Sequence, residues 1–140
     1  MRLGLDFLKL VWQLDHGLRS RSKRMEQELG VTGPQRFAIR MLGDQGPLSA
    51  GELAEHLELH PSTLTGVLER LLRAGLVTRT SDPSDGRKVV LALTEAGKRI
   101  DRRQSGTVES AVRSALSQAS PEDRAAARRV LELIVKALEN

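Results

Sequence analysis

The side chains that could do chemistry in this sequence are mainly basic, and they gather in its middle. Residues 61–103 hold nine Lys and Arg against five Asp and Glu, whereas residues 1–60 and 104–140 each balance to zero. The middle therefore carries the whole net charge of +4. A localised basic region is typical of a protein that binds a polyanion, because the phosphates it neutralises release counterions. The alternative is an ordinary solvated basic surface.

Small hydroxyl residues open the predicted helix that carries the first of these cations. Pro61 suits the first turn of a helix and Gly75 ends it. At 100° per residue, one face of this helix collects the apolar residues Leu64, Val67, Leu68 and Leu71. The opposite face collects Ser62, Gly66, Glu69, Arg70 and Arg73. The small residues Ser62, Thr63 and Thr65 would allow close approach to a DNA groove, and the two Arg could reach phosphates or guanine edges. An amphipathic surface helix is the alternative.

Two segments rich in Val, Thr and Leu follow, Leu76–Ser81 and Lys88–Leu93, and they predict a β-hairpin. Turn-forming residues 82–87 separate them. In that turn Gly86 permits a positive φ, and Asp85 is close enough in sequence to pair with Arg87. A hairpin directly after a recognition helix is a wing, which could lay Arg79, Arg87 or Lys88 against the minor groove or the phosphate backbone.

The elements that must position these residues are helices with clear start and stop signals. The sequence Thr32-Gly33-Pro34-Gln35 has the form of a capping box, and Gly43 and Gly46 are expected to end the helix that follows. Ser49 caps a short helix through Leu57. The tight turn between this short helix and Pro61 predicts a helix-turn-helix.

Long helices are predicted at both ends of the chain. One runs from Leu3 to about Leu29 and stops at Gly30, and another follows the N-cap Thr94 through Ile100 as far as Leu116. Ser120 caps a last helix, whose apolar stripe consists of Val130, Leu131, Ile134 and Leu138. A small winged helix-turn-helix cannot cover these apolar faces, so we expect a homodimer built from residues ~5–25 and ~108–139 that buries on the order of 2,000 Å².

The hairpin and its flanks resemble the MarR-type transcriptional regulators. The match consists of residues 82–87 followed by Val89, Val90, Leu91, Leu93, Thr94 and Gly97, and it is preceded by Leu71, Gly75, Leu76, Val77 and Arg79. The resemblance implies a mainly α fold: a winged helix-turn-helix with a two-stranded β wing, plus N- and C-terminal helices that form a dimerisation region. The 140 residues then form one chain, with a DNA-binding region at 32–97 and dimerisation helices at 1–30 and 98–140.

The same resemblance implies residue roles. Ser62, Thr63 and Thr65 match positions that approach bases, and Arg70 matches a commonly basic position of the recognition helix. Asp85 and Arg87 match the wing pair, with Arg87 at the minor groove. Three residues depart from the family pattern: Gly66 and Gly86 stand where relatives often carry larger or basic side chains, and His60 is an unusual N-cap. The function implied is a ligand-responsive repressor that binds a pseudo-palindromic operator in double-stranded DNA as a homodimer.

The composition of the sequence argues against several other classes of protein and site. With no Cys there is no disulfide, thiol switch or zinc–thiolate site, and the absence of Tyr with 2% aromatic residues disfavours RNA-binding modules that stack bases. The sequence has no secretory signal and no long apolar run, so a cytoplasmic protein that neither spans nor binds a membrane is expected. No phosphate loop or catalytic motif is present, so we expect neither an enzyme nor a cofactor.

Two ligand hypotheses and one further function remain open. His16 could face a pocket with Trp12, Phe37 and Arg40, where Arg40 would suit a small anionic effector. Glu52, His56 and His60 are spaced so that a metal-responsive regulator is conceivable, although a solvated helix surface is the simpler interpretation and no metal ligand is assigned. A dimeric interaction module without specific DNA binding is the other alternative.

Overall fold

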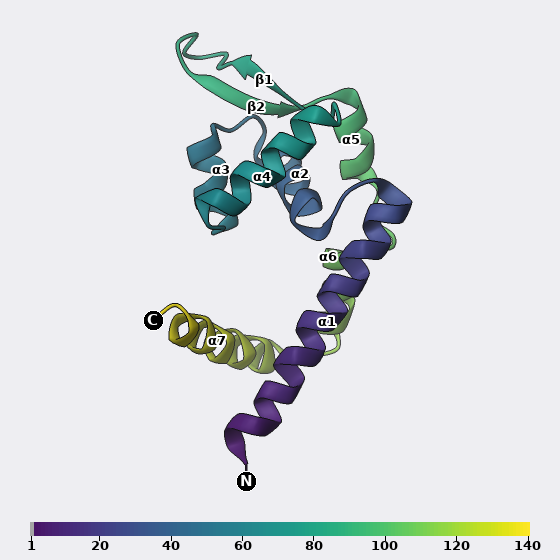
Figure 1. Ribbon diagram of the computed structural model, residues 1–140, viewed down its shortest axis with the longest axis vertical. Helices are drawn as coiled ribbons and strands as arrows, with labels where there is room; N and C mark the ends of the chain where they lie inside the picture. The colour runs from purple at the N-terminus through teal and green to yellow at the C-terminus, as the bar shows by residue number, and fades with distance from the viewer. Residues whose placement is uncertain (1) are drawn as a thin grey trace. The chain divides into compact units, whose positions relative to one another are not determined.

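The computed structural model describes residues 2–140 and divides them into two compact units, one that ends at Thr107 and one that spans Val108–Asn140 (Figure 1). The first unit contains α1 (Leu3–Leu29), α2 (Gly33–Gln45), α3 (Ala50–Leu57), α4 (Pro61–Arg73), β1 (Val77–Ser81), β2 (Val89–Leu93) and α5 (Glu95–Arg102). The second contains α6 (Val108–Ser117) and α7 (Pro121–Leu138). The mainly α fold with a two-stranded sheet is confirmed.

Local capping explains where most helices begin and end. At α2 the capping box is complete, since Thr32 Oγ1 accepts the Gln35 N–H at 3.4 Å and Gln35 Oε1 accepts the Thr32 N–H at 3.0 Å. Thr94 caps α5 and Ser120 caps α7 in the same N-terminal manner. Gly30 ends α1 with a φ of 78°, which only glycine adopts without strain.

The helix-turn-helix consists of α3 and α4, which the short segment 58–60 joins. Glu58 ends α3 in the left-handed conformation with a φ of 52°, and Pro61 then opens α4. The predicted apolar face of α4 is buried and lies in one core with residues from α2, α3 and the hairpin: Ala38, Ile39, Leu42, Leu53, Leu57, Leu64, Val67, Leu68, Leu71, Val77, Val90 and Leu91. Burial of this face leaves the other face of α4 exposed to solvent.

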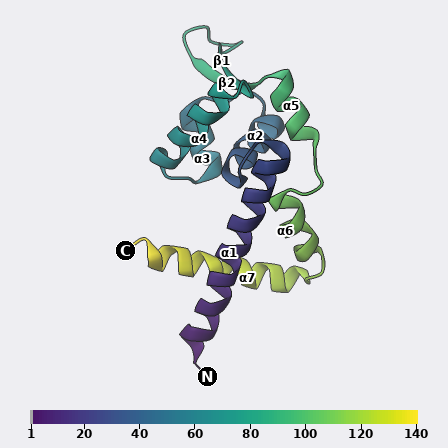
Figure 2. The same cartoon turned by 45° about the vertical axis from the view of Figure 1, so that its right-hand side comes forward.

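The β1–β2 hairpin is antiparallel, with Val77 opposite Leu93 and Ser81 opposite Val89. It extends beyond the helices of its unit in both views (Figures 1 and 2). Its base is attached through Leu48, which exchanges two backbone hydrogen bonds with Leu91, of 3.1 and 2.7 Å. Thr94 Oγ1 donates to Gly75 O at 2.6 Å and so joins the end of the hairpin to the end of α4.

A buried arginine fastens α5 to α2. The Arg36 guanidinium is almost fully buried and donates to three backbone carbonyls at the end of α5, those of Ile100, Asp101 (3.2 Å) and Arg103 (2.6 Å). Carbonyls at the end of a helix lack the N–H of a following turn as a partner, and among these three only Ile100 O also accepts a backbone N–H, that of Arg103 at 3.1 Å. A cation at a helix C-terminus also interacts favourably with the helix dipole. The end of α5 is thereby held in the first unit.

Three details of the sequence interpretation are wrong. Gly43 does not end a helix: it lies inside α2, and a Cβ there would overlap the Asp101 carboxylate, so glycine serves a close approach of α5. Gly86 does not use a positive φ, because the turn closes through hydrogen bonds at Asp82 and Asp85 instead. The helix expected from Thr94 to Leu116 is two helices, interrupted at 103–107, where Gly106 has a φ of 76°.

The second unit and most of α1 differ from this core. No side chain of α6 or α7 is fully buried, and in α1 the buried residue is Met25, near its C-terminal end. There α1 joins α2 through the Gly33 N–H, which donates to Ser22 Oγ at 2.6 Å. Across residues 2–140 no helix combines the length and the apolar character needed to cross a membrane.

Candidate DNA-binding surface

The start of α4 presents three hydroxyl residues at an exposed helix end. His60 caps this end: its Nδ1 accepts the Ser62 N–H at 3.2 Å and lies 2.7 Å from Ser62 Oγ. The Thr65 hydroxyl donates to Pro61 O at 2.9 Å, so its oxygen lone pairs remain available to accept a hydrogen bond. Thr63 is exposed. His60 thus caps the helix although its residue type is uncommon at that position.

The two arginines of α4 lie at its other end. Arg70 and Arg73 are exposed and belong to the last turn, about 12–16 Å along the axis from Ser62 at 1.5 Å per residue. At that position they also complement the negative end of the helix dipole. The two arginines and Ser62 were predicted to lie on one face of this helix, but they are at opposite ends of it.

The wing tip is an ordered turn that exposes a guanidinium. The Asp85 carboxylate accepts the Arg87 N–H at 3.1 Å and lies 3.8 Å from Arg87 Nε, which confirms the expected pair. The Arg87 side chain is nevertheless 97% exposed. On the other side of the turn, the Asp82 carboxylate accepts the Ser84 N–H (2.8 Å) and hydroxyl (2.7 Å), and these two hydrogen bonds lower the pKa of Asp82. Arg79 is exposed in β1, opposite Leu91.

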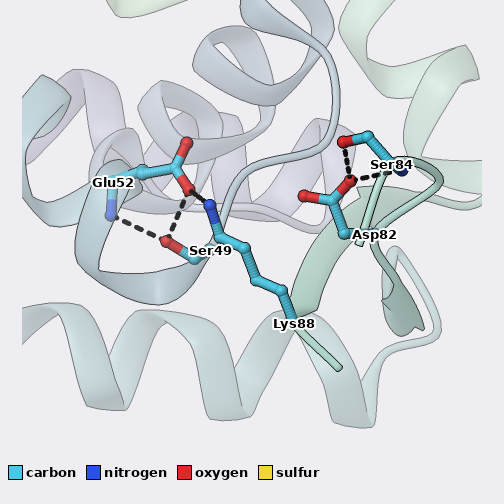
Figure 3. A network of polar contacts seen from close by, with 5 residues as sticks. All are labelled: Ser49, Glu52, Asp82, Ser84 and Lys88. Atoms are coloured by element: carbon cyan, nitrogen blue, oxygen red, sulfur yellow. Dashed lines mark hydrogen bonds and ion pairs between the residues drawn. The ribbon is translucent and has the colours of Figure 1, made fainter. Parts of the chain in front are cut away.

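Lys88 is engaged within the protein, unlike Arg87. Its Nζ donates to Glu52 Oε1, and the same carboxylate accepts the Ser49 hydroxyl at 2.9 Å (Figure 3). The hydrogen bond from Lys88 is the largest cause that lowers the pKa of Glu52, and the reciprocal hydrogen bond raises the pKa of Lys88. Both groups therefore stay ionised at neutral pH.

Sequence reasoning did not find the roles of Glu52 and Arg36. The sequence predicts Glu52 as the last residue of a capping motif that begins at Ser49, and offers it as a metal ligand, but it does not predict the contact with Lys88. Arg36 directly precedes the apolar residues Phe37, Ala38 and Ile39, and a cation at that place in a predicted helix indicates a buried partner. Neither partner could be read from spacing along the chain.

Of the four residues of the ligand hypothesis, three are exposed and the fourth, Arg40, binds an acid of α5. Arg40 forms a 2.5 Å ion pair with Asp101, while the side chains of Trp12 and Phe37 are 65% and 47% exposed. His16 is exposed on α1. An anion at Arg40 would have to compete with the Asp101 carboxylate. The pocket made of these four residues stays a prediction.

The residues of the metal hypothesis are also engaged elsewhere. Glu52 accepts from Ser49 and Lys88, and His60 Nδ1 accepts from Ser62. Within the part of the chain that the structure describes, no group of three or more His, Asp or Glu side chains is arranged to hold a metal ion.

An exposed helix start in a helix-turn-helix, followed by a hairpin with a basic tip, defines a winged helix-turn-helix protein. The MarR family profile matches residues 31–89, which begin just after α1 and run from α2 to the first residue of β2. The HTH-type transcriptional repressor Rv2887 of Mycobacterium tuberculosis is 30% identical over 123 residues, which cover 88% of each chain. This chain belongs to the MarR family, a family of DNA-binding transcriptional regulators and not of enzymes.

Solved structures agree with this assignment. The PcaV transcriptional regulator from Streptomyces coelicolor, solved with its natural ligand, superposes with a TM-score of 0.71 at 26% identity over 92% of this chain and 91% of that one. Overoxidized AbfR bound to DNA superposes with a TM-score of 0.66 at 25% identity over 99% and 96%. The likeness therefore extends over nearly the whole chain.

Proposed function

We propose that this protein is a homodimeric repressor that binds a pseudo-palindromic operator and releases it in response to a small anionic ligand. The observation that carries the proposal is the pair of exposed elements in one unit, the hydroxyl-bearing start of α4 and the basic wing tip at Arg87. A recognition helix reads the major groove and a wing reaches the minor groove or backbone. The relative Rv2887 is named as a repressor, and AbfR is solved on DNA.

Residue roles follow from this arrangement. Ser62, Thr63 and Thr65 would approach bases, because small side chains let the helix enter the groove closely. The cations Arg70, Arg73, Arg79 and Arg87 would contact phosphates or the minor groove, with Asp85 orienting Arg87. Lys88 fits this role less well, since Glu52 already binds its ammonium group.

The proposed dimer rests on exposed apolar side chains at both ends of the chain. In α1 these are Leu3, Leu5, Phe7, Leu8, Leu10, Trp12, Leu14 and Leu18, and in α7 they are Val130, Leu131, Leu133, Val135 and Leu138. Patches of this kind on a monomer mark an interface, and a second copy is the simplest partner. The terminal helices are therefore assigned to dimerisation, and residues 32–97 to DNA binding.

The effector part of the proposal rests on Arg40. PcaV was solved with its natural ligand, and a guanidinium that already holds a carboxylate can exchange it for a carboxylate of a ligand. The proposed site consists of Trp12, His16, Phe37 and Arg40. In a thermal-shift screen of small aromatic acids, an acid that binds this site should raise the melting temperature of the wild type and leave that of Arg40→Ala unchanged. A hit that stabilises both proteins equally places the ligand elsewhere.

The DNA contacts can be separated by their dependence on salt. Arg87→Ala should weaken specific and non-specific DNA alike, and the slope of log K against log salt should shrink by about 2 units, because a symmetric dimer loses two contacts. Thr63→Leu adds bulk without changing charge, so it should reduce specific binding and leave the slope nearly unchanged. Titrations of a duplex selected from a random pool, at several salt concentrations, measure both quantities.

The result that overturns the wing assignment is an unchanged salt slope for Arg87→Ala. If the wild-type protein selects no sequence from the random pool, the repressor proposal itself is wrong. The interaction module without specific DNA binding would then be the better description.

A further inference from the structure

The contact between Glu52 and Lys88 joins two parts of the DNA-binding unit that are 36 residues apart in sequence. Glu52 lies in the first turn of α3, and Lys88 immediately precedes β2 at the wing. We propose that these two are positioning residues that hold the wing in place against the helix-turn-helix, and that Lys88 serves this purpose instead of contacting phosphate. The proposal rests on the DNA-binding function proposed above.

The Glu52 carboxylate, which accepts the hydrogen bond from Lys88, is oriented by contacts within its own helix. Glu52 Oε1 accepts the Ser49 hydroxyl at 2.9 Å, and Ser49 Oγ accepts the Glu52 N–H at 3.1 Å. The carboxylate is thus fixed to the start of α3 by the same serine that caps the helix (Figure 3). Because the acceptor loses little further freedom when it binds Lys88, the contact defines a position for the wing.

The place of Lys88 along the hairpin explains how this contact can restrict movement of the wing. The Leu48–Leu91 bridge attaches the base of the hairpin. Lys88 lies three residues closer to the tip, about 10 Å further along an extended strand. The other attachments of the hairpin, including Thr94 and the buried Val90, also lie near its base, so they leave the outer part free to bend, whereas a contact closer to the tip restricts that bending. Arg87 is the next residue toward the tip, so its guanidinium is the group whose position is controlled.

The charges explain why Lys88 is a poor phosphate ligand. The bond to Glu52 raises the pKa of Lys88, and Asp82 and Asp85 of the turn raise it further. An ammonium group surrounded in this way carries little net positive potential toward DNA. The pair is also exposed, with side chains 44% and 40% accessible, so it contributes little to folding stability. Loss of the Glu52–Lys88 pair should therefore change the affinity for DNA more than the free energy of unfolding.

The sign of one substitution distinguishes the two roles of Lys88. Glu52→Gln removes a negative charge near the DNA-binding surface. If Lys88 were a phosphate contact that Glu52 restrains, the variant should bind DNA more tightly and with a steeper salt slope. If the pair positions the wing, the variant should bind about three- to tenfold more weakly with an unchanged slope, because ordering of the wing is then completed only on binding.

The experiment measures binding of the full-length chain to a duplex selected by the wild type from a random pool. Glu55→Gln is the matched control, since it removes an exposed acid one turn later on the same helix. Lys88→Met should match the loss of Glu52→Gln, and the double variant should lose no more than either single one. Additive losses, or tighter binding by Glu52→Gln, overturn the proposal.

A second measurement keeps this test independent of DNA. In the free protein, 15N relaxation should show greater mobility of residues 82–88 in Glu52→Gln than in the wild type or in Glu55→Gln. Unchanged mobility there overturns the positioning role whatever the DNA result. If the wild type binds no DNA but the wing loosens as expected, the repressor proposal fails while the positioning contact stands.

Discussion

The winged helix-turn-helix and the terminal helices contain the same apolar residue types with opposite results. Leu53 of α3 is fully buried, whereas Leu133 of α7 is 68% exposed. In the first region the apolar faces of α2, α3 and α4 and the hairpin cover one another. In α6, α7 and the first half of α1 the apolar faces lie open. The winged helix-turn-helix therefore has its core within one chain, whereas the terminal helices leave apolar side chains exposed, and this exposure is what the proposed dimer would remove.

The largest expected effect is loss of the dimer. Leu131→Glu places a charge in the apolar stripe of α7, and burying an unpaired carboxylate in an interface is strongly unfavourable. Light scattering at micromolar concentration should give twice the chain mass of 15.4 kDa for the wild type and the chain mass for the variant. Arg129→Glu, on the opposite face of α7, is the control and should stay dimeric. A monomeric wild type removes the basis of the comparison.

An intermediate effect is expected from matched leucine truncations. Leu53→Ala removes a fully buried side chain and should lower the free energy of unfolding by about 2–5 kcal/mol. Leu133→Ala removes a side chain that is 68% exposed in the single chain, so the folding of that chain should lose at most about 0.5 kcal/mol, and any larger loss measures burial in the proposed dimer. Urea unfolding at one fixed protein concentration checks both, because the stability of a dimer depends on concentration. Equal losses would mean that Leu133 is buried in the dimer.

The smallest effects concern glycines inside the DNA-binding unit. A Cβ at Gly97 would overlap the Leu76 carbonyl oxygen, so Gly97→Ala should cost about 1–3 kcal/mol of stability. At Gly66 a Cβ meets no atom within 4 Å, so Gly66→Ala should stabilise α4 by about 0.5–1 kcal/mol. Thermal unfolding of the two variants should shift in opposite directions. Shifts of the same sign would contradict the close approach of α5 to the Leu76 carbonyl.

Most element boundaries were predictable because their causes are local. Thr32, Ser49, Thr94 and Ser120 each accept a backbone N–H three residues later, and such a contact forms within the first turn whatever surrounds it. The buried face of α4 was predictable for the same reason, since helical periodicity alone assigns side chains to faces. The Asp85–Arg87 pair also spans only two residues.

The errors arose where distant residues meet. Both Gly43 and Gly46 were predicted to end α2, but only Gly46 does: the helix continues past Gly43, where a Cβ would overlap the Asp101 carboxylate of α5. The spacing of Ile100 and Val108 predicted one continuous helix, but residues 103–107 contain no apolar side chain and the helix is interrupted there, where Arg36 binds the carbonyls at the end of α5. Periodicity records which side chains are apolar and contains no information on what competes for the backbone.

The sequence by itself determined the helical start signals, the wing, the basic region and the family resemblance, since each depends on residues close together along the chain. Only the tertiary structure decided that Lys88 binds Glu52, that Arg36 holds the end of α5 and that Arg40 binds Asp101. These pairs are separated by 36 to 67 residues. A charged side chain can reach any opposite charge that folding brings near, so its partner is fixed only when the fold places both groups within hydrogen-bonding distance.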